Sequence, residues 1–254
     1  MELAVNSGKR VTHVPDLPGE DYLDVLARMH QILQPKSYVE LGAGAGDSLR
    51  LAACPSIAVG TNFQISTDVL GGKPECYFFR MSSDDFFRQH SPTQLLGRAV
   101  DFSLIDDMHL FEFTIRDFVN LERHGRPNSI IAIHDCFPVD AYIATRVNDR
   151  AEREKSSTKP GWWTGDVWKI ILILQKYRPD LKIVNLDAPP TGLTLITNLY
   201  PKSTILLDRY HDITAELLNL HLVEYGVARL HAEANFVSTR SLQKLEDFGP
   251  MFWL

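Results

Sequence analysis

Residues 37–52 read SYVELGAGAGDSLRLA, and this stretch decides the fold. A short apolar run contains the acid Glu40, and glycines follow at positions 42, 44 and 46. Glycine permits tight turns and lets the backbone approach a ligand closely. We therefore expect a buried strand, a ligand-binding loop at its carboxyl end, and a helix over 46–54 whose first N–H groups add hydrogen-bond donors.

The rest of the chain repeats this alternation of strand and helix. Short apolar runs predict strands, and amphipathic runs predict helices. The expected strands are 37–41, 56–62, 75–80, 100–107, 129–135, 181–186 and 191–199. The expected helices are 20–33, 46–54, 83–90, 111–125 and 166–180. Near-continuous apolar strands separated by helices predict an α/β protein with a doubly wound, mostly parallel, Rossmann-like seven-stranded sheet and helices on both faces.

The same pattern divides the chain into three parts. Residues 1–35 are expected to form an N-terminal lead-in and a helix, and residues 36–200 the sheet domain. The last two strands are close enough in sequence to form a hairpin, so one strand near the edge should be antiparallel. Residues 201–254 are expected to be a C-terminal helical appendage packed on the domain, with a helical stretch over 206–231. A dimer contact or a lid is the alternative role for this appendage.

The spacing of the glycines indicates which ligand the loop holds. A dinucleotide fingerprint, G-x-G-x-x-G, would need glycine at position 47, where this chain has Asp47. The pattern present is E-x-G-x-G-x-G, with Glu40 two residues before the first glycine. An acid at that position suits a cationic or hydrogen-bond-donating ligand better than a pyrophosphate.

The segment VELGAGAGDS resembles motif I of the class I S-adenosylmethionine (SAM)-dependent methyltransferases. In that family the loop wraps the amino-acid part of the cofactor, and an acid after the second strand binds the ribose, where this chain has Asn62. Ser83 and Asp84, after the third strand, resemble the site at the adenine edge. The cofactor-binding residues that this resemblance implies are Glu40, Gly42, Gly44, Gly46, Asn62, Ser83, Asp84 and Asp106.

Two further segments resemble a subgroup that includes macrolide and sugar O-methyltransferases. IDDMH follows the fourth strand and ends at His109, and IHD follows the fifth with His134 and Asp135. The resemblance implies a metal site of Asp106, His134 and Asp135, and its mixed ligands would suit magnesium or manganese. The metal-free alternative makes His134, Asp135 and His109 catalytic, with an imidazole as general base. For His109 the favoured alternative is a cap on the following helix.

The segment KPGWWTGDVWK follows the fifth strand. Trp162 and Trp163 are expected on a loop, where flat apolar rings can stack on a substrate, and Trp168 is expected in the core. Packing of the loop against the domain, with Thr164 or Asp166 as helix cap, is the other interpretation. Arg146 and Lys169 could pair with an anionic substrate, or could simply be solvated.

Composition excludes several classes of protein. The net charge is −6 over 254 residues, and no basic run is present, which argues against nucleic-acid and membrane-surface partners. The three cysteines are odd in number and form no CxxC pair, as in proteins of a reducing compartment. The N-terminus lacks the layout of a signal peptide. We therefore expect a cytoplasmic protein that acts on a small molecule and could form a homo-oligomer.

These observations together predict an enzyme, a SAM-dependent methyltransferase that methylates a small-molecule hydroxyl, for example of a sugar or natural product. One alternative is a protein that keeps the fold and has lost catalysis, because Asn62 replaces the ribose-binding acid. The other is a nicotinamide-dependent oxidoreductase, against which the missing third glycine of the fingerprint counts.

Overall fold

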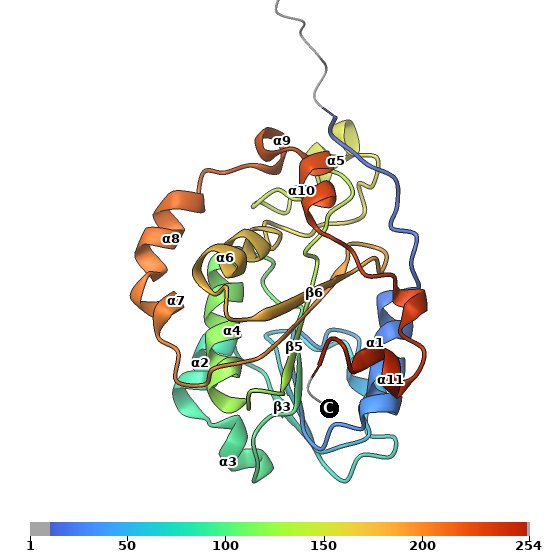
Figure 1. Ribbon diagram of the computed structural model, residues 1–254, viewed down its shortest axis with the longest axis vertical. Helices are drawn as coiled ribbons and strands as arrows, with labels where there is room; N and C mark the ends of the chain where they lie inside the picture. Colours follow the sequence, from blue (N-terminus) through green and yellow to red (C-terminus); the bar gives the residue numbers. More distant parts are fainter. Residues whose placement is uncertain (1–10, 253–254) are drawn as a thin grey trace, which may run out of the picture.

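The computed structural model describes residues 11–252, and their centre is a seven-stranded sheet (Figure 1). Its strands are β1 (Tyr38–Leu41), β2 (Ser56–Val59), β3 (Cys76–Phe79), β4 (Phe102–Ile105), β5 (Ile130–His134), β6 (Lys182–Leu186) and β7 (Leu193–Thr197). They lie in the order β3-β2-β1-β4-β5-β7-β6, and only β7 runs antiparallel to its neighbours. The predicted doubly wound, mostly parallel sheet with one antiparallel strand near its edge is confirmed.

The register of the central strands aligns their carboxyl ends. Leu41 at the end of β1 lies opposite Val59 of β2 and Ile105 of β4. Ile105 in turn lies opposite Ile133 of β5. The loops that follow these four strands therefore leave the sheet at one edge, which is where an open α/β sheet binds its ligand.

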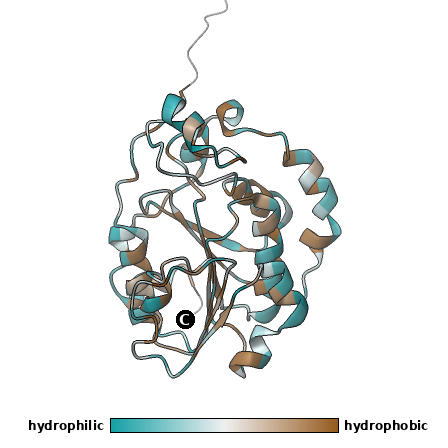
Figure 2. Cartoon of the chain, turned by 180° about the vertical axis from the view of Figure 1, so that it is seen from behind, coloured by the Kyte–Doolittle hydropathy of each residue, from teal (hydrophilic) through white to brown (hydrophobic). Residues whose placement is uncertain are grey.

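Helices and loops cover both faces of the sheet. On one face, α2 (Ser83–Gln89), α4 (Phe111–His124) and α6 (Lys169–Tyr177) pack on one hydrophobic cluster. On the other, α1 (Tyr22–Leu33) and α11 (Leu245–Phe248) enclose a second cluster (Figure 1). The strands are largely brown, and the helices carry both teal and brown segments (Figure 2), as expected for a buried sheet under amphipathic helices. In the part of the chain that is described, no helix is long and apolar enough to cross a membrane.

The prediction of a helix over 46–54 is wrong. The structure has a single 3₁₀ turn, η1 (Leu49–Leu51), where the N–H groups of Arg50, Leu51 and Ala52 donate to the carbonyls of Gly46, Ser48 and Leu49. Pro55 ends the segment, because the residue before a proline avoids helical geometry and the chain must enter β2 at once. The loop after β2 takes the place of the missing helix: the amides of Gln64 and Ser66 donate to the carbonyls of Gly44 and Ala45.

The C-terminal part is helical, as expected, but the stretch over 206–231 is not continuous. It divides into α7 (Ile205–Asp208), α8 (Tyr210–Leu217), α9 (Leu222–Tyr225) and α10 (Val227–Glu233). The chain then returns beside β6, where the Asp187 N–H donates to the carbonyl of Val237. Two further short helices, α3 (Pro92–Leu96) and α5 (Arg150–Ser156), lie within the connections between strands. Buried residues from 205–234 join the first cluster, and buried residues from 242–252 join the second.

One buried acid in α4 has no partner. Asp117 is 1% exposed, and neither carboxyl oxygen finds a hydrogen-bond donor among the described residues. Burial raises the pKa of this carboxyl from 3.8 to about 8, against the smaller lowering effect of the nearby Ser83 hydroxyl, which is not in hydrogen-bond geometry. The folded state therefore holds a proton that the unfolded state releases, so stability falls as pH rises from about 4 to about 8.

Asp117→Asn should remove this pH-dependent cost. We expect the variant to be more stable than the wild type by roughly 1–3 kcal/mol at pH 8, because a neutral amide is less costly to bury than a carboxylate. The advantage should shrink as pH falls toward 5. Urea unfolding of both proteins at pH 5 and pH 8 measures it, and an equal difference at the two pH values would contradict the raised pKa.

Candidate functional site

The glycine loop forms one wall of a small cavity at the carboxyl edge of the sheet. The cavity has a volume of about 170 Å³. Its lining residues are Gly42, Gly44, Gly60, Thr61, Asn62, Asp106, Asp107, Met108 and His109. They come from the loops after β1, β2 and β4, so the predicted loop and the predicted acids meet as the topology requires.

Gly42 and Gly44 are glycines for two different structural reasons. Gly42 has φ +93°, and a Cβ there would lie 2.1 Å from the carbonyl oxygen of Asp106, so the two strand ends pack backbone to backbone. Gly44 has φ +46°, and a Cβ there would meet nothing nearer than 3.8 Å. The space beside Gly44 is the open part of the loop, where a ligand can approach the backbone.

Glu40 supports the loop from beneath and does not line the cavity. It is fully buried, and its carboxylate accepts hydrogen bonds from the hydroxyls of Tyr38, at 2.8 Å, and Ser48, at 2.5 Å. Burial raises the pKa of Glu40 to about 7, against the lowering effect of these two hydroxyls. The acid of the motif therefore fixes the shape of the loop through Ser48.

The other expected cofactor residues are divided between the cavity and the first face of the sheet. Asn62 lines the cavity and is exposed at its rim. Ser83 is buried at the start of α2, and Asp84 pairs with Arg116 through bonds of 2.8 and 2.7 Å. Neither Ser83 nor Asp84 lines the cavity, and the carboxylate of Asp84 is already occupied by a guanidinium.

Acids and histidines from the ends of β4 and β5 form a cluster next to the cavity. His134 Nδ1 lies 3.3 Å from Asp106 Oδ1. His109 Nδ1 lies 2.8 Å from Asp135 Oδ2, within ion-pair distance, although its N–H is not in line for a hydrogen bond. Catalytic hydrogen bonds are often poorly aligned in a protein without substrate. The structure thus brings all four predicted side chains together.

The backbone of this cluster is held in an uncommon conformation. His109 has φ +51° and Asp135 has φ +64°, values that cost energy for residues other than glycine. A Cβ at Gly165 would lie 1.7 Å from the carbonyl oxygen of His109, which also accepts the Asp166 N–H. The loop that contains Trp163 therefore holds His109 in place, and the Trp163 ring stacks on the imidazole with centroids 5.1 Å apart.

The helix after His109 is capped by a different residue. The Phe111 N–H, at the start of α4, donates to Asp166 Oδ1 at 3.0 Å. The prediction that His109 caps α4 is therefore wrong. The prediction that Asp166 caps the helix that follows it is also wrong, since α6 begins only at Lys169. His109 instead faces Asp135, and Asp166 holds the first turn of α4.

The charges of the cluster favour protonated imidazoles. Burial lowers the pKa of His134, but Asp135 and Asp106 outweigh it and raise the pKa to about 9. Burial likewise opposes protonation of His109, and Asp135 raises its pKa above 6.5. The same histidines hold the pKa of Asp135 below 3.8 despite its burial. His134 is thus a cation at neutral pH, and its charge offsets the two carboxylates.

Two members of the cluster carry no sequence signal. The Tyr22 ring, at the start of α1, stacks on His134 with centroids 4.0 Å apart, and burial raises the pKa of its phenol. Thr191 donates its hydroxyl to Asp135 and lies 3.3 Å from His134 Nε2. Both come from segments far from motif I in the chain, so only the folded structure identifies them.

Asp106, His134 and Asp135 meet one condition for a divalent metal. Each offers a ligand atom, and these atoms lie within 4.8 Å of one another. A metal needs a neutral imidazole, whereas the neighbouring carboxylates keep His134 protonated. The donor set therefore fits a metal only after the loss of this proton, and binding would release it.

The tryptophan and basic residues of the following loop have structural partners. Trp168 is fully buried, which confirms it as a core residue, and Trp162 is half-buried under Lys159. Arg146 bridges Glu112 and Asp166, and buried Lys169 also binds Asp166 at 2.8 Å. Neither cation is free for an anionic substrate. Trp163, half-buried against His109, is the tryptophan of this loop that contacts the cluster.

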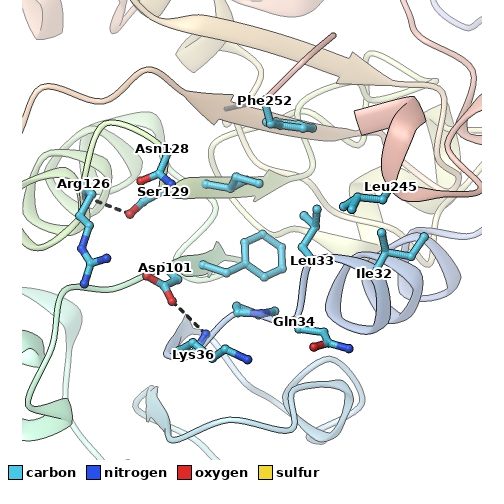
Figure 3. A pocket seen from close by; sticks show the side chains of 13 residues that line it. Ile32, Leu33, Gln34, Lys36, Asp101, Arg126, Asn128, Ser129, Leu245 and Phe252 are labelled. Atoms are coloured by element: carbon cyan, nitrogen blue, oxygen red, sulfur yellow. Dashed lines mark hydrogen bonds between the residues drawn. The ribbon is translucent and has the colours of Figure 1, made fainter. Parts of the chain in front are cut away.

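A larger cavity, of about 490 Å³, lies at the opposite edge of the sheet (Figure 3). It is bounded by residues before β1, β4 and β5, among them Lys36, Asp101 and Ser129, and by Phe252. The dashed lines in Figure 3 mark two hydrogen bonds: the Lys36 N–H donates to the carboxylate of Asp101, which joins the segments before β1 and β4, and the Arg126 N–H donates to the Ser129 hydroxyl within a local turn. This cavity lies at the amino ends of β1, β4 and β5, whereas the acid–histidine cluster lies at the carboxyl ends of β4 and β5, so the length of the strands separates the two.

No protein-family model and no curated protein matches the chain. Among solved structures, an O-methyltransferase from Bacillus cereus in complex with SAH is 14% identical, with a TM-score of 0.48, over 71% of this chain and 84% of that one. The O-methyltransferase TomG from Streptomyces achromogenes, in complex with SAM, is 13% identical, with a TM-score of 0.44, over 69% and 77%. SAH-bound methyltransferase PaMTH1 from Podospora anserina is 12% identical, with a TM-score of 0.46, over 68% and 75%. Similarities this distant do not assign a function.

Proposed function

We propose that this protein is a SAM-dependent methyltransferase that transfers a methyl group to a hydroxyl of a small molecule. The observation that carries the proposal is the position of the open glycine loop beside a histidine–carboxylate pair at one sheet edge. The loop offers backbone at Gly44, and Thr61 and Asn62 offer hydrogen-bonding groups at the ribose position that the motif implies. Bound SAM would supply an electrophilic methyl group.

The residues of the chain would then act on the acceptor. His109 is the favoured general base, because Asp135 contacts Nδ1 and no described residue hydrogen-bonds Nε2. Both nitrogens of His134 face protein oxygens, so His134 is better suited to offset the charges of Asp106 and Asp135. Trp163 and Tyr22 would exclude water and position the acceptor ring or sugar.

The 170 Å³ cavity is smaller than the 300–1,000 Å³ usual for a drug-sized ligand, so it would enclose only part of the cofactor. The adenine end would lie toward the open rim beyond Asn62, because Ser83 and Asp84 do not reach the cavity. Loss of catalysis is the alternative that this small volume and Asn62 keep open. The cytoplasmic location and a homo-oligomer remain predictions.

Methyl transfer to a panel of hydroxylated small molecules tests the proposal. With methyl-labelled SAM we expect label in an acceptor together with an equal amount of S-adenosylhomocysteine. Parallel reactions with a chelator, and with added magnesium or manganese, separate the two uses of the acid cluster: a chelator-insensitive reaction would assign His109 as base without metal. Binding of SAM without transfer to any acceptor class would favour the non-catalytic alternative.

A further inference from the structure

Arg153, on α5, is a buried cation without an anion. This residue is 5% exposed, and among residues 11–252 its side chain makes one hydrogen bond, from Nε to the carbonyl oxygen of Pro160 at 3.2 Å. The Nη1 atom is buried without an acceptor, and no acid within residues 11–252 pairs with this guanidinium. Buried arginines are almost always paired, because an isolated charge is costly to remove from water.

Arg153 borders a cavity of about 270 Å³ that lies apart from the glycine loop. The other lining residues are Tyr142, Thr145, Val147, Asp149 and Glu152. Both acids in the lining already have partners: Asp149 accepts the Glu152 N–H as the cap of α5, and Glu152 pairs with Lys155. The cavity is therefore bordered by a guanidinium that has no acid partner, together with the aromatic ring of Tyr142 and the aliphatic side chain of Val147.

This combination defines the chemistry of a ligand. A guanidinium with free N–H groups binds a carboxylate or phosphate through paired hydrogen bonds. Asp149 and Glu152 at the same cavity would repel a doubly charged phosphate more than a singly charged carboxylate. Tyr142 and Val147 favour an apolar or aromatic body next to the charged group.

The cavity is linked to the proposed site of methyl transfer through Trp163. The Trp163 Nε1–H donates to the carbonyl of Thr145, which lines the cavity, at 2.7 Å. The same indole stacks on His109. Trp163 therefore contacts both the wall of this cavity and the histidine–carboxylate pair.

We propose that this cavity binds the carboxylate of an aromatic or apolar acid, with Arg153 as its anchor, and that this acid is the methyl acceptor or carries it. Only the role as acceptor rests on the proposed function. The binding site itself does not, and it can be tested without SAM.

Calorimetric titration of the full chain with benzoate, benzamide and phenyl phosphate tests the binding site. We expect benzoate to bind the wild type, and benzamide, which lacks the charge, to bind at least about tenfold more weakly. Arg153→Met should weaken benzoate binding by about tenfold or more, and Arg153→Lys, which keeps the charge but not the fork, by less. Arg150→Met is the matched control, since Arg150 lies on the same helix with an exposed side chain, and it should bind benzoate as the wild type does.

Thermal unfolding of the same variants separates a ligand anchor from a structural cation. Because Arg153 has no acid partner, Arg153→Met should unfold at the same temperature as the wild type or higher. A clearly lower unfolding temperature would overturn the proposal and assign Arg153 to the fold. So would no benzoate binding by the wild type, unchanged binding by Arg153→Met, or a preference for phenyl phosphate. Failure of methyl transfer with intact benzoate binding would contradict the proposed function and leave this site standing.

Discussion

Asp135→Asn is expected to lower kcat for methyl transfer by roughly 10²- to 10⁴-fold, while the affinity for SAM stays within about twofold. Asp135 lies 2.8 Å from His109 Nδ1 and does not line the glycine-loop cavity. The carboxylate favours the proton on Nδ1, which leaves Nε2 free to accept the proton of the substrate hydroxyl. Asparagine presents an N–H to Nδ1 instead and selects the tautomer that cannot act as a base.

The pH profile supplies a second signature of this variant. Asp135 raises the pKa of His109, so removal of its charge should lower that pKa. The acid limb of the kcat profile should therefore move to lower pH, even as the maximal rate falls. A change that only disturbed the fold would lower the rate without this shift.

Asparagine is the substitution of choice because Asp135 has φ +64°, a conformation that asparagine tolerates better than most residues. Asp212→Asn is the matched control, since Asp212 is exposed on α8 and, within the described part of the chain, has Arg209 as its one ionic partner, at 3.4 Å. Single-turnover rates and SAM titrations of both variants make the comparison. An Asp135→Asn enzyme with near wild-type kcat would remove the pair from the mechanism.

Gly42→Ala and Gly44→Ala should have opposite consequences for stability and ligand binding. At Gly42 a methyl group would lie 2.1 Å from the backbone oxygen of Asp106, at φ +93°. We expect a loss of more than about 3 kcal/mol in the free energy of unfolding, because two paired strand ends must separate. At Gly44 the methyl group would meet open space, so the cost should be only about 1 kcal/mol, from the positive φ.

The ligand distinguishes the two glycines further. The Gly44→Ala methyl group would project where the structure leaves room beside the loop, so SAM affinity should fall about tenfold or more in a protein that still folds. Urea unfolding and SAM titration of both variants provide the test. Equal stability of the two variants would contradict the close approach at Gly42, and wild-type SAM affinity of Gly44→Ala would show that the cofactor does not use this loop.

The alternation of apolar runs was sufficient to predict every described strand and the edge where the site lies. The prediction of a helix over 46–54 failed, because Pro55 ends the segment and the loop after β2 donates hydrogen bonds to the carbonyls of Gly44 and Ala45. Helix propensity depends on the local sequence, so it cannot predict hydrogen bonds to the distant residues 64–66.

The same limit applies to the site. Asp106, His109, His134 and Asp135 were predictable because they end adjacent strands of one sheet. Tyr22 and Thr191 were not, since their contacts with His134 depend on how α1 and the loop before β7 pack. Arg153 was not predictable either, because its distinguishing property is the absence of a partner, which appears only in the folded chain.

Calorimetric titration of the purified protein with SAM, with NAD as the comparison, tests the central claim most directly. The open loop beside Gly44 and the acid–histidine cluster predict that each chain binds one SAM with micromolar affinity. NAD should not bind, because this chain lacks the third glycine and the helix N-terminus that would hold the pyrophosphate. Binding of NAD, or of neither compound, would contradict the account. In the second case Asn62 and the small cavity would mark a fold that has lost its cofactor.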